Sequence, residues 1–259
     1  MELLLCGFMM DKMILKNKVA IVTGSTRGIG EAIVRTLASE GAKVIINSYH
    51  SINEGEVLAK ELNSKGFNTA YIRADISNEA DVRRLFEETI KVYGVVDILI
   101  NNAGVLYRKK EIEESDIQDY LNLHLINGFG VYLCSEYAGR YMEKGKIVNI
   151  SSIYGIVPNP NSILASGVKA EVESYTKAFA TKYGDRIKVN SVAPGYTDTK
   201  IVQNNFSQEE LEKVIEKTLS KKLLLPNEIA EIVLFLLKND NIVGQTIIVD
   251  DGFLLNSDN

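Results

Sequence analysis

The chain has 259 residues and a formal net charge of −5, with its 29 Lys and Arg scattered along the sequence. This length fits one domain with a continuous core, and scattered basic residues argue against a nucleic-acid-binding surface. No apolar run is long enough to cross a membrane. The two cysteines, Cys6 and Cys134, lack metal-ligand spacing. We therefore expect reduced thiols, no metal site and a cytoplasmic location.

The N-terminus begins with a short apolar run, residues 3–10, which Asp11 and Lys12 interrupt. The run is too short for a membrane span, and Glu2 stands where a secretory signal carries basic residues. Met13 is an alternative start just before the first strand. We predict a short extension over residues 1–12 and a single domain over residues 13–259.

Short apolar runs alternate with helical patterns through the rest of the chain. The candidate strands are residues 19–22, 44–46, 70–72, 97–100, 147–150, 189–192 and 247–249. Most are continuously apolar, as expected of strands covered on both faces. This alternation predicts right-handed βαβ units and an α/β fold with a doubly wound, seven-stranded parallel sheet.

The helices are indicated by apolar spacing and by their end signals. Ile29, Ile33 and Leu37 recur at helical spacing, and an apolar stripe over residues 82–90 is followed by Gly94, a typical C-cap. A polar helix is expected around 208–220, and a further helix from Pro226 onward.

A glycine cluster directly follows the first strand. Gly24, Gly28 and Gly30 are placed where a strand turns into a helix, so the backbone can approach a pyrophosphate at the helix N-terminus. Asn101-Asn102-Ala103-Gly104 follows the fourth strand. A second interpretation of Asn101 and Asn102 is that they only tie neighbouring strands together. The cluster and this segment together predict a dinucleotide site.

Residues 23–30 (TGSTRGIG), residues 101–104 (NNAG), Ser152 and Lys169 occur in an order that resembles the short-chain dehydrogenase/reductase family, from about Lys18 to Phe253. The resemblance implies a Rossmann fold and hydride transfer between a nicotinamide and a small carbonyl or alcohol substrate, similar to the 3-oxoacyl-acyl-carrier-protein reductases. It implies these cofactor-binding residues: Gly24, Ser25, Thr26, Arg27, Gly28, Ile29, Gly30, Ser48, Asp75, Ile76, Asn102, Ala103, Gly104, Lys169, Pro194, Gly195, Thr197 and Thr199.

The identity of the dinucleotide is inferred from charge. An NAD site usually places a carboxylate just past the second strand, where it binds the ribose hydroxyls. Here residues 45–50 contain none, and Ser48 stands at that point. Arg27 in the glycine turn can pair with a 2′-phosphate, or it is simply solvated. We therefore predict NADP(H), with NAD(H) as the weaker ligand.

The catalytic residues depart from the family pattern. In the family a lysine binds the nicotinamide ribose and lowers the pKa of a tyrosine four residues earlier, while a serine hydrogen-bonds the substrate carbonyl. The lysine corresponds to Lys169 and the serine to Ser152, seventeen positions apart as in the family. The tyrosine position is Ala165. The usual acid/base is therefore absent.

The family also has an asparagine that holds a proton-relay water, and the corresponding position here is His124. One interpretation is that the His124 imidazole supplies the missing proton. The other is a substitution that drifted after catalysis was lost, or a histidine satisfied by its neighbours. Asn122 and Asn127 fit only with a helix shift, and Tyr154 and Tyr107 are weaker substitutes.

Two further features are implied by the resemblance. Residues 196–225 correspond to the family's lid over the substrate. The helices at about 112–143 and 162–183 correspond to those that pack against a second copy, and their apolar residues predict a homodimer or homotetramer. These residues are Phe129, Val131, Tyr132, Val172, Tyr175 and Phe179.

Two functions from different classes follow. The first is an NADP-dependent oxidoreductase whose catalysis is impaired or atypical. The second is a catalytically inactive relative that binds the nucleotide as a sensor or scaffold. Retention of Ser152, Lys169 and the glycine turn favours the first, and loss of the tyrosine favours the second.

Overall fold

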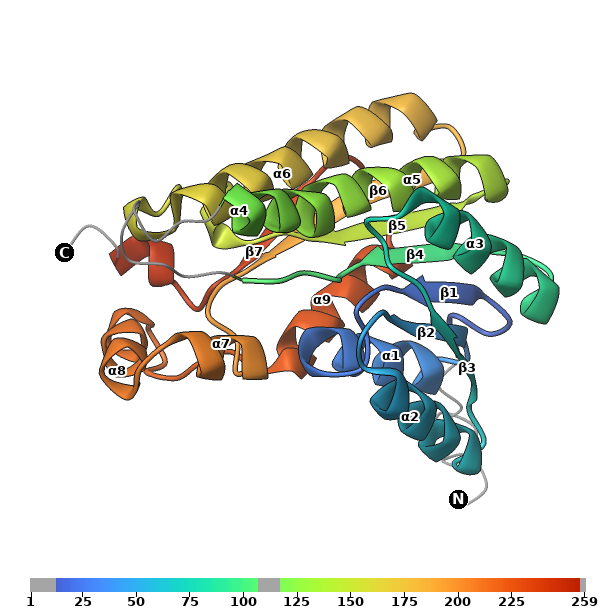
Figure 1. Ribbon diagram of the computed structural model, residues 1–259, viewed down its shortest axis with the longest axis horizontal. Helices are drawn as coiled ribbons and strands as arrows, with labels where there is room; N and C mark the ends of the chain where they lie inside the picture. Colours follow the sequence, from blue (N-terminus) through green and yellow to red (C-terminus); the bar gives the residue numbers. More distant parts are fainter. Residues whose placement is uncertain (1–12, 107–116, 257–259) are drawn as a thin grey trace, which may run out of the picture.

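The computed structural model describes residues 13–106 and 117–256. Its centre is one parallel sheet with the strand order β3-β2-β1-β4-β5-β6-β7 (Figure 1). The strands are β1 (Val19–Val22), β2 (Lys43–Ser48), β3 (Asn68–Arg73), β4 (Ile98–Asn101), β5 (Gly145–Ile150), β6 (Ile187–Pro194) and β7 (Thr246–Val249). The predicted fold class and all seven predicted strands are confirmed. Several strands are longer than predicted because polar residues such as Asn47 and Ser48 continue the ladder to β3.

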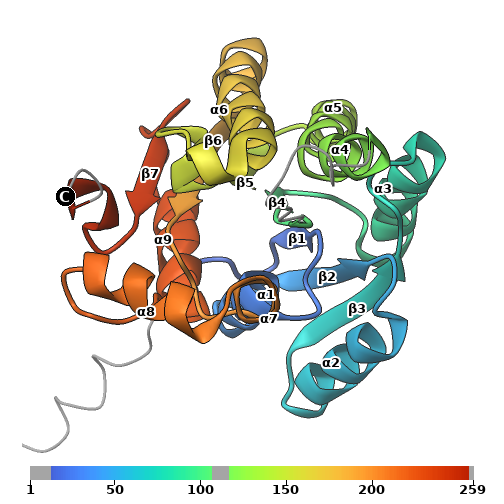
Figure 2. The ribbon, with the colours of Figure 1, turned by 60° about the vertical axis from the view of Figure 1, so that its left-hand side comes forward.

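Helices cover both faces of the sheet (Figures 1 and 2). One face carries α1 (Gly28–Ser39), α2 (Ile52–Ser64) and α9 (Pro226–Lys238). The other carries α3 (Glu79–Tyr93), α5 (Gly130–Tyr141) and α6 (Ile163–Tyr183). Toward the carboxyl ends of the strands lie α4 (Ile117–His124), α7 (Lys200–Asn205) and α8 (Gln208–Lys217). In the described residues no helix combines the length and apolarity needed to cross a bilayer.

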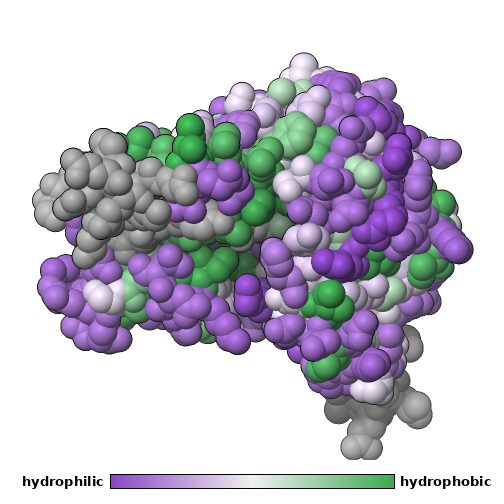
Figure 3. Space-filling model, in the orientation of Figure 1, coloured by the Kyte–Doolittle hydropathy of each residue, from purple (hydrophilic) through white to green (hydrophobic). Residues whose placement is uncertain are grey.

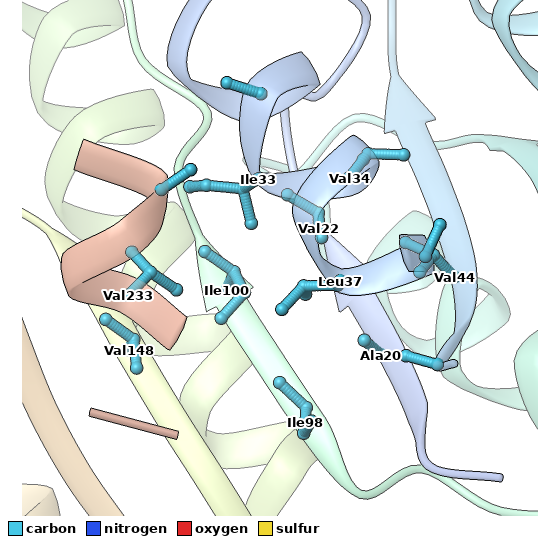
Figure 4. Packing of buried hydrophobic residues seen from close by; sticks show 14 of the residues in the cluster. Ala20, Val22, Ile33, Val34, Leu37, Val44, Ile98, Ile100, Val148 and Val233 are labelled. Carbon is cyan, nitrogen blue, oxygen red and sulfur yellow. The ribbon is translucent and has the colours of Figure 1, made fainter. Parts of the chain in front are cut away.

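Alternate residues of a strand point to opposite faces of the sheet and pack into two separate hydrophobic cores. Ala20 and Val22 of β1 pack toward α1 and α9, where Leu37 and Val233 are fully buried (Figure 4). Ile21 between them points to the opposite face, toward α3 and α5. Because both faces are covered, a central strand such as β1 is continuously apolar. Truncating one of these buried leucines to alanine costs ~2–5 kcal/mol of stability.

The ends of several helices follow local signals. Asn78 accepts a hydrogen bond from the Asp81 amide at the start of α3, and Gly94 ends that helix in the left-handed conformation, with φ 85°, as predicted. α9 begins at Pro226, also as predicted. α8 ends at Lys217, before the predicted residue 220, because Thr218 adopts an extended conformation.

The helix predicted over 112–143 differs from the structure, which describes it from residue 117 onward. α4 ends at His124, and a π-helical turn, η2 (Leu125–Phe129), separates it from α5. A π turn holds one more residue than an α turn, so every residue after it is shifted around the helix axis. Glycines permit close packing here, since a Cβ on Gly130 would lie 2.6 Å from Ile76 Cδ1.

Candidate active site

A cavity of about 610 Å³ lies outside the carboxyl ends of the strands. Its centre lies at the end of β1, which has β2 on one side and β4 on the other. At this point the order of the strands in the sheet reverses, and the connections that follow β1 and β4 run to opposite sides. Ligands of open α/β sheets bind at such a point. The space-filling view shows the surface hollowed between the α4/α6 side and the α7/α8 side, with apolar side chains in the hollow (Figure 3).

Nearly all of the predicted site residues line this one cavity. They are Gly24, Thr26, Arg27, Gly28, Ile29, Gly30, Ser48, Asp75, Ile76, Asn102, Ala103, Gly104, Ser152, Lys169, Pro194, Gly195, Thr197 and Thr199. Two predicted residues, Ser25 and His124, do not line it. The topology thus gathers segments that are far apart in the sequence at one edge of the sheet.

The glycine turn has a shape that only glycine allows. Gly24 has φ 60°, and a Cβ there would lie 2.5 Å from Ala103 Cα. Gly28 has φ 58°. Arg27 occupies the N-cap of α1 without a side-chain capping bond, so the first amides of this helix face the cavity uncapped. A bare helix N-terminus beside a close-packed turn fits the pyrophosphate of a dinucleotide.

Asparagine side chains hold the loops of this edge together. The Asn102 amide donates to the carbonyls of Thr23 and Gly24, at 2.9 and 2.8 Å. Asn101 donates to Asn149 Oδ1 at 2.8 Å, which links β4 to β5. The strand-tying interpretation of both asparagines is confirmed, and Asn102 also lines the cavity.

Ser25 belongs to this framework and not to the cavity wall. Its side chain is fully buried, and Oγ donates to the Val22 carbonyl at 2.7 Å. The same Oγ accepts from the Asn47 amide at 3.0 Å. Asn47 in turn donates to the Ile72 and Ala74 carbonyls. Ser25 thus fixes the ends of β1 and β2 relative to one another, which the motif alone does not reveal.

The cavity wall past β2 contains hydroxyl groups and a cation. Ser48 Oγ donates to the Ser51 carbonyl at 3.1 Å, and Arg27 is exposed at the start of α1. Among the described residues that line the cavity, Asp75 has the only carboxylate. Asp75 Oδ1 accepts two bonds from Ser77, through its amide and its hydroxyl. An anionic group near Arg27 therefore meets a cation and no opposing carboxylate on the wall past β2.

Ser152, Ala165 and Lys169 face the cavity from two adjoining segments. Ser152 precedes the 3-10 turn η3 (Ile153–Gly155), and its Oγ accepts from the Tyr154 amide at 3.2 Å, which leaves the hydroxyl proton to donate. Lys169 Nζ donates to the Ile150 carbonyl at 2.8 Å. Burial lowers the pKa of Lys169 to about 8, and the negative charge of Glu173 opposes this shift.

His124 does not stand where the sequence analysis placed it. Its Nδ1 lies 3.1 Å from Glu171 Oε2 on α6, so the imidazole faces a neighbouring helix. The side chain that reaches the cavity is Asn127, which is buried in η2. Asn127 accepts from the Val105 amide and donates to the Val105 carbonyl, each at 2.8 Å. The π turn supplies the helix shift that an assignment to Asn127 required.

Two further tyrosines were considered from the sequence. Tyr154 lines the cavity, and its hydroxyl lies 2.5 Å from the hydroxyl of Tyr196, which also lines it. Tyr107 lies outside the described residues. In the predicted lid region, α7 contributes Ile201 and Val202 to the cavity wall. No sequence signal pointed to the pairing of the two hydroxyls, because it joins segments 42 positions apart.

The fold and the cavity define a dinucleotide-binding α/β oxidoreductase, and comparison with known proteins identifies the family. Residues 24–254 match the family model described as enoyl-(acyl carrier protein) reductase. The chain belongs to the short-chain dehydrogenase/reductase family.

Three relatives illustrate this membership. The chain is 35% identical to cis-4-hydroxycyclohexanecarboxylate dehydrogenase of Sinomonas cyclohexanicum, over 92% of the chain and 96% of the relative. It is 34% identical to the 3-oxoacyl-[acyl-carrier-protein] reductase of a Staphylococcus epidermidis strain, over 92% and 100%. A short-chain dehydrogenase from Burkholderia cenocepacia, solved in complex with NADP, superposes with a TM-score of 0.87 at 28% identity, covering 93% of this chain and 99% of the other.

Proposed function

We propose that this chain is an NADP(H)-dependent oxidoreductase that interconverts a small carbonyl compound and its alcohol. The observation that carries the proposal is a single cavity that contains the glycine turn, the open α1 N-terminus, Ser152 and Lys169. The names of two relatives support the substrate class, since one refers to a hydroxy compound and the other to a 3-oxoacyl compound.

The residues have separate tasks in this function. The amides at the start of α1 bind the pyrophosphate, and Arg27 binds the 2′-phosphate. The Ser152 hydroxyl donates a hydrogen bond to the substrate carbonyl oxygen and so orients it. Asn127 holds the loop after β4 through Val105. The nicotinamide supplies or accepts the hydride when it is bound.

Cofactor choice is tested by calorimetric titration with NADPH and NADH. We expect NADPH to bind at least about tenfold more tightly, because hydrogen bonds to charged groups contribute ~1.5–3 kcal/mol. Equal affinities would contradict the assignment of the 2′-phosphate to Arg27. If neither NADPH nor NADH binds, the proposed function itself is contradicted.

We further propose that Ala165 stands in the place of the family tyrosine and that turnover is reduced for this reason. A positioned acid contributes ~10²–10⁴-fold in rate. Ala165→Tyr would place a phenol one helical turn before Lys169, whose positive charge favours the phenolate. We expect this variant to reduce ketones faster than the natural chain at equal NADPH saturation. If neither protein reduces a ketone although NADPH binds, the inactive relative is the better description.

Assembly into a homodimer or homotetramer stays a prediction, and one part of its original basis is wrong. Val131, Val172 and Phe179 are buried within a single copy of the chain, so they offer no surface to a partner. Tyr132 remains 37% exposed beside Phe129 and Tyr175. We propose that these aromatic rings on α5 and α6 contact a second copy. Light scattering that gives the mass of a single chain at micromolar concentration would contradict this.

A further inference from the structure

Ala165 and Lys169 are four residues apart on α6, so their side chains lie on the same face of the helix. Both line the cavity together with Ser152. A methyl group at position 165 occupies much less space than an aromatic side chain. The small side chain at position 165 therefore leaves the cavity open along this face of α6, where Lys169 and Ser152 both line it.

Among the residues that the structure describes, the Lys169 ammonium has one hydrogen-bond acceptor. Nζ donates to the Ile150 carbonyl, which uses one of its three N–H groups. In the described part of the chain, no carboxylate lies within ion-pair distance of Nζ. The remaining protons are thus available to a group in the cavity. With its pKa lowered to about 8 by burial, Lys169 is protonated at neutral pH and gives up a proton readily.

The other candidate donors have partners of their own. His124 is paired with Glu171 and does not line the cavity. The hydroxyls of Tyr154 and Tyr196 are hydrogen-bonded to each other, which engages one of their two protons. Glu173 on the same helix is the charged group that acts on Lys169, and Tyr154, Tyr196 and Lys200 are titratable groups that line the same cavity.

Resting on the proposed function, we propose that Lys169 itself donates the proton in carbonyl reduction, directly or through one water in the space beside Ala165. The carbonyl carbon gains the hydride, and the π electron pair of the C=O bond moves onto oxygen. The oxygen takes a proton from Nζ while Ser152 donates a hydrogen bond to it. Lys169 becomes a neutral amine and regains its proton from solvent. The oxidation of an alcohol runs through the same steps in reverse.

Glu173 raises the proton affinity of Lys169 from outside the cavity, against the larger effect of burial. Its carboxylate accepts from Ser191 Oγ at 3.2 Å and from Thr246 Oγ1, and it does not line the cavity. Its negative charge favours the protonated lysine. Glu173→Gln keeps hydrogen-bond acceptors for Ser191 and Thr246 but removes the charge, so the pKa of Lys169 falls further.

The first test is the pH dependence of single-turnover reduction, with saturating NADPH and ethyl acetoacetate or cyclohexanone as probe. Only protonated Lys169 donates, so the rate is constant below about pH 8 and falls tenfold per pH unit above it. In Glu173→Gln the break moves to lower pH with NADPH affinity unchanged. A break that does not move in Glu173→Gln overturns the proposal.

The second test is chemical rescue. Lys169→Ala lowers the rate of reduction by ~10²–10⁴-fold. Added methylammonium then raises the rate of this variant by about tenfold or more. The matched control is Lys169→Ala combined with Ala165→Tyr, in which tyrosine donates and methylammonium has no effect. Failure of rescue in the single variant overturns the proposal.

The two levels of inference fail differently. Turnover in Ala165→Tyr but none in the natural chain overturns Lys169 as the donor and leaves the proposed function intact. No turnover in either protein, despite NADPH binding, overturns both.

Discussion

The two halves of the cavity are built in different ways. At the ends of β1, β2 and β4, the shape of the wall is set by backbone turns that contain glycines and are held by asparagine side chains bonded to main-chain atoms. At the ends of β5 and β6, the wall consists of side chains from η2, η3 and α6. The first half depends on a local sequence motif, whereas the second depends on how distant elements pack. A substitution therefore has different consequences in each half.

The largest effect is expected in the backbone-built half. Gly24→Ala places a Cβ at φ 60° and 2.5 Å from Ala103 Cα, so the turn and the segment after β4 must separate. We expect NADPH affinity to fall by about 100-fold or more, equivalent to ~2.7 kcal/mol, in calorimetric titration.

Gly94→Ala is the matched control for Gly24→Ala. It has a similar left-handed φ of 85°, but no atom lies within 4 Å of the added Cβ. We expect this variant to lose stability and to keep its NADPH affinity within about twofold. If both variants bind NADPH equally well, close packing of the glycine turn is not what shapes the cofactor site.

The side-chain-built half is tested by comparing Asn127 with His124. Asn127→Ala removes both bonds to Val105 and leaves a partly buried amide and carbonyl without this partner, at a cost of ~1 kcal/mol or more. Because the loop after β4 then shifts, we expect kcat to fall by about 10–100-fold. His124→Ala should change kcat by less than about twofold. Both values of kcat are measured at saturating NADPH. A larger loss of kcat in His124→Ala than in Asn127→Ala would indicate that His124 is a catalytic residue.

The sequence predicted the two halves unequally for a physical reason. The strands and the glycine turn could be predicted because apolar runs and glycine spacing are local signals. His124 was assigned from the resemblance to the family, and the π turn that begins at the next residue and contains Asn127 gives the helix shift that the resemblance does not reveal. Ser25 lies within the motif but points into the framework, since motif membership does not reveal side-chain direction. The low pKa of Lys169 comes from burial, which depends on tertiary packing.

A smaller effect is expected from Arg27, which lies at the rim of the backbone-built half. Arg27→Ala removes the exposed cation at the start of α1 but no hydrogen bond of the framework. We expect NADPH affinity to fall by about tenfold while NADH affinity stays unchanged, because only NADPH carries the 2′-phosphate. The difference between the cofactors should narrow further at high salt. Equal losses for both cofactors would mean that Arg27 acts on the shape of the turn and not on the phosphate.

The smallest effect on binding is expected from Ser25, although it lies inside the glycine motif. Ser25→Ala removes the bond to the Val22 carbonyl and leaves the Asn47 amide without its acceptor. We expect a stability loss of ~1–2 kcal/mol in urea unfolding, since both groups are buried. NADPH affinity, measured well below the unfolding transition, should change by less than about threefold because Ser25 does not line the cavity. A large loss of affinity with unchanged stability would place Ser25 on the cofactor after all.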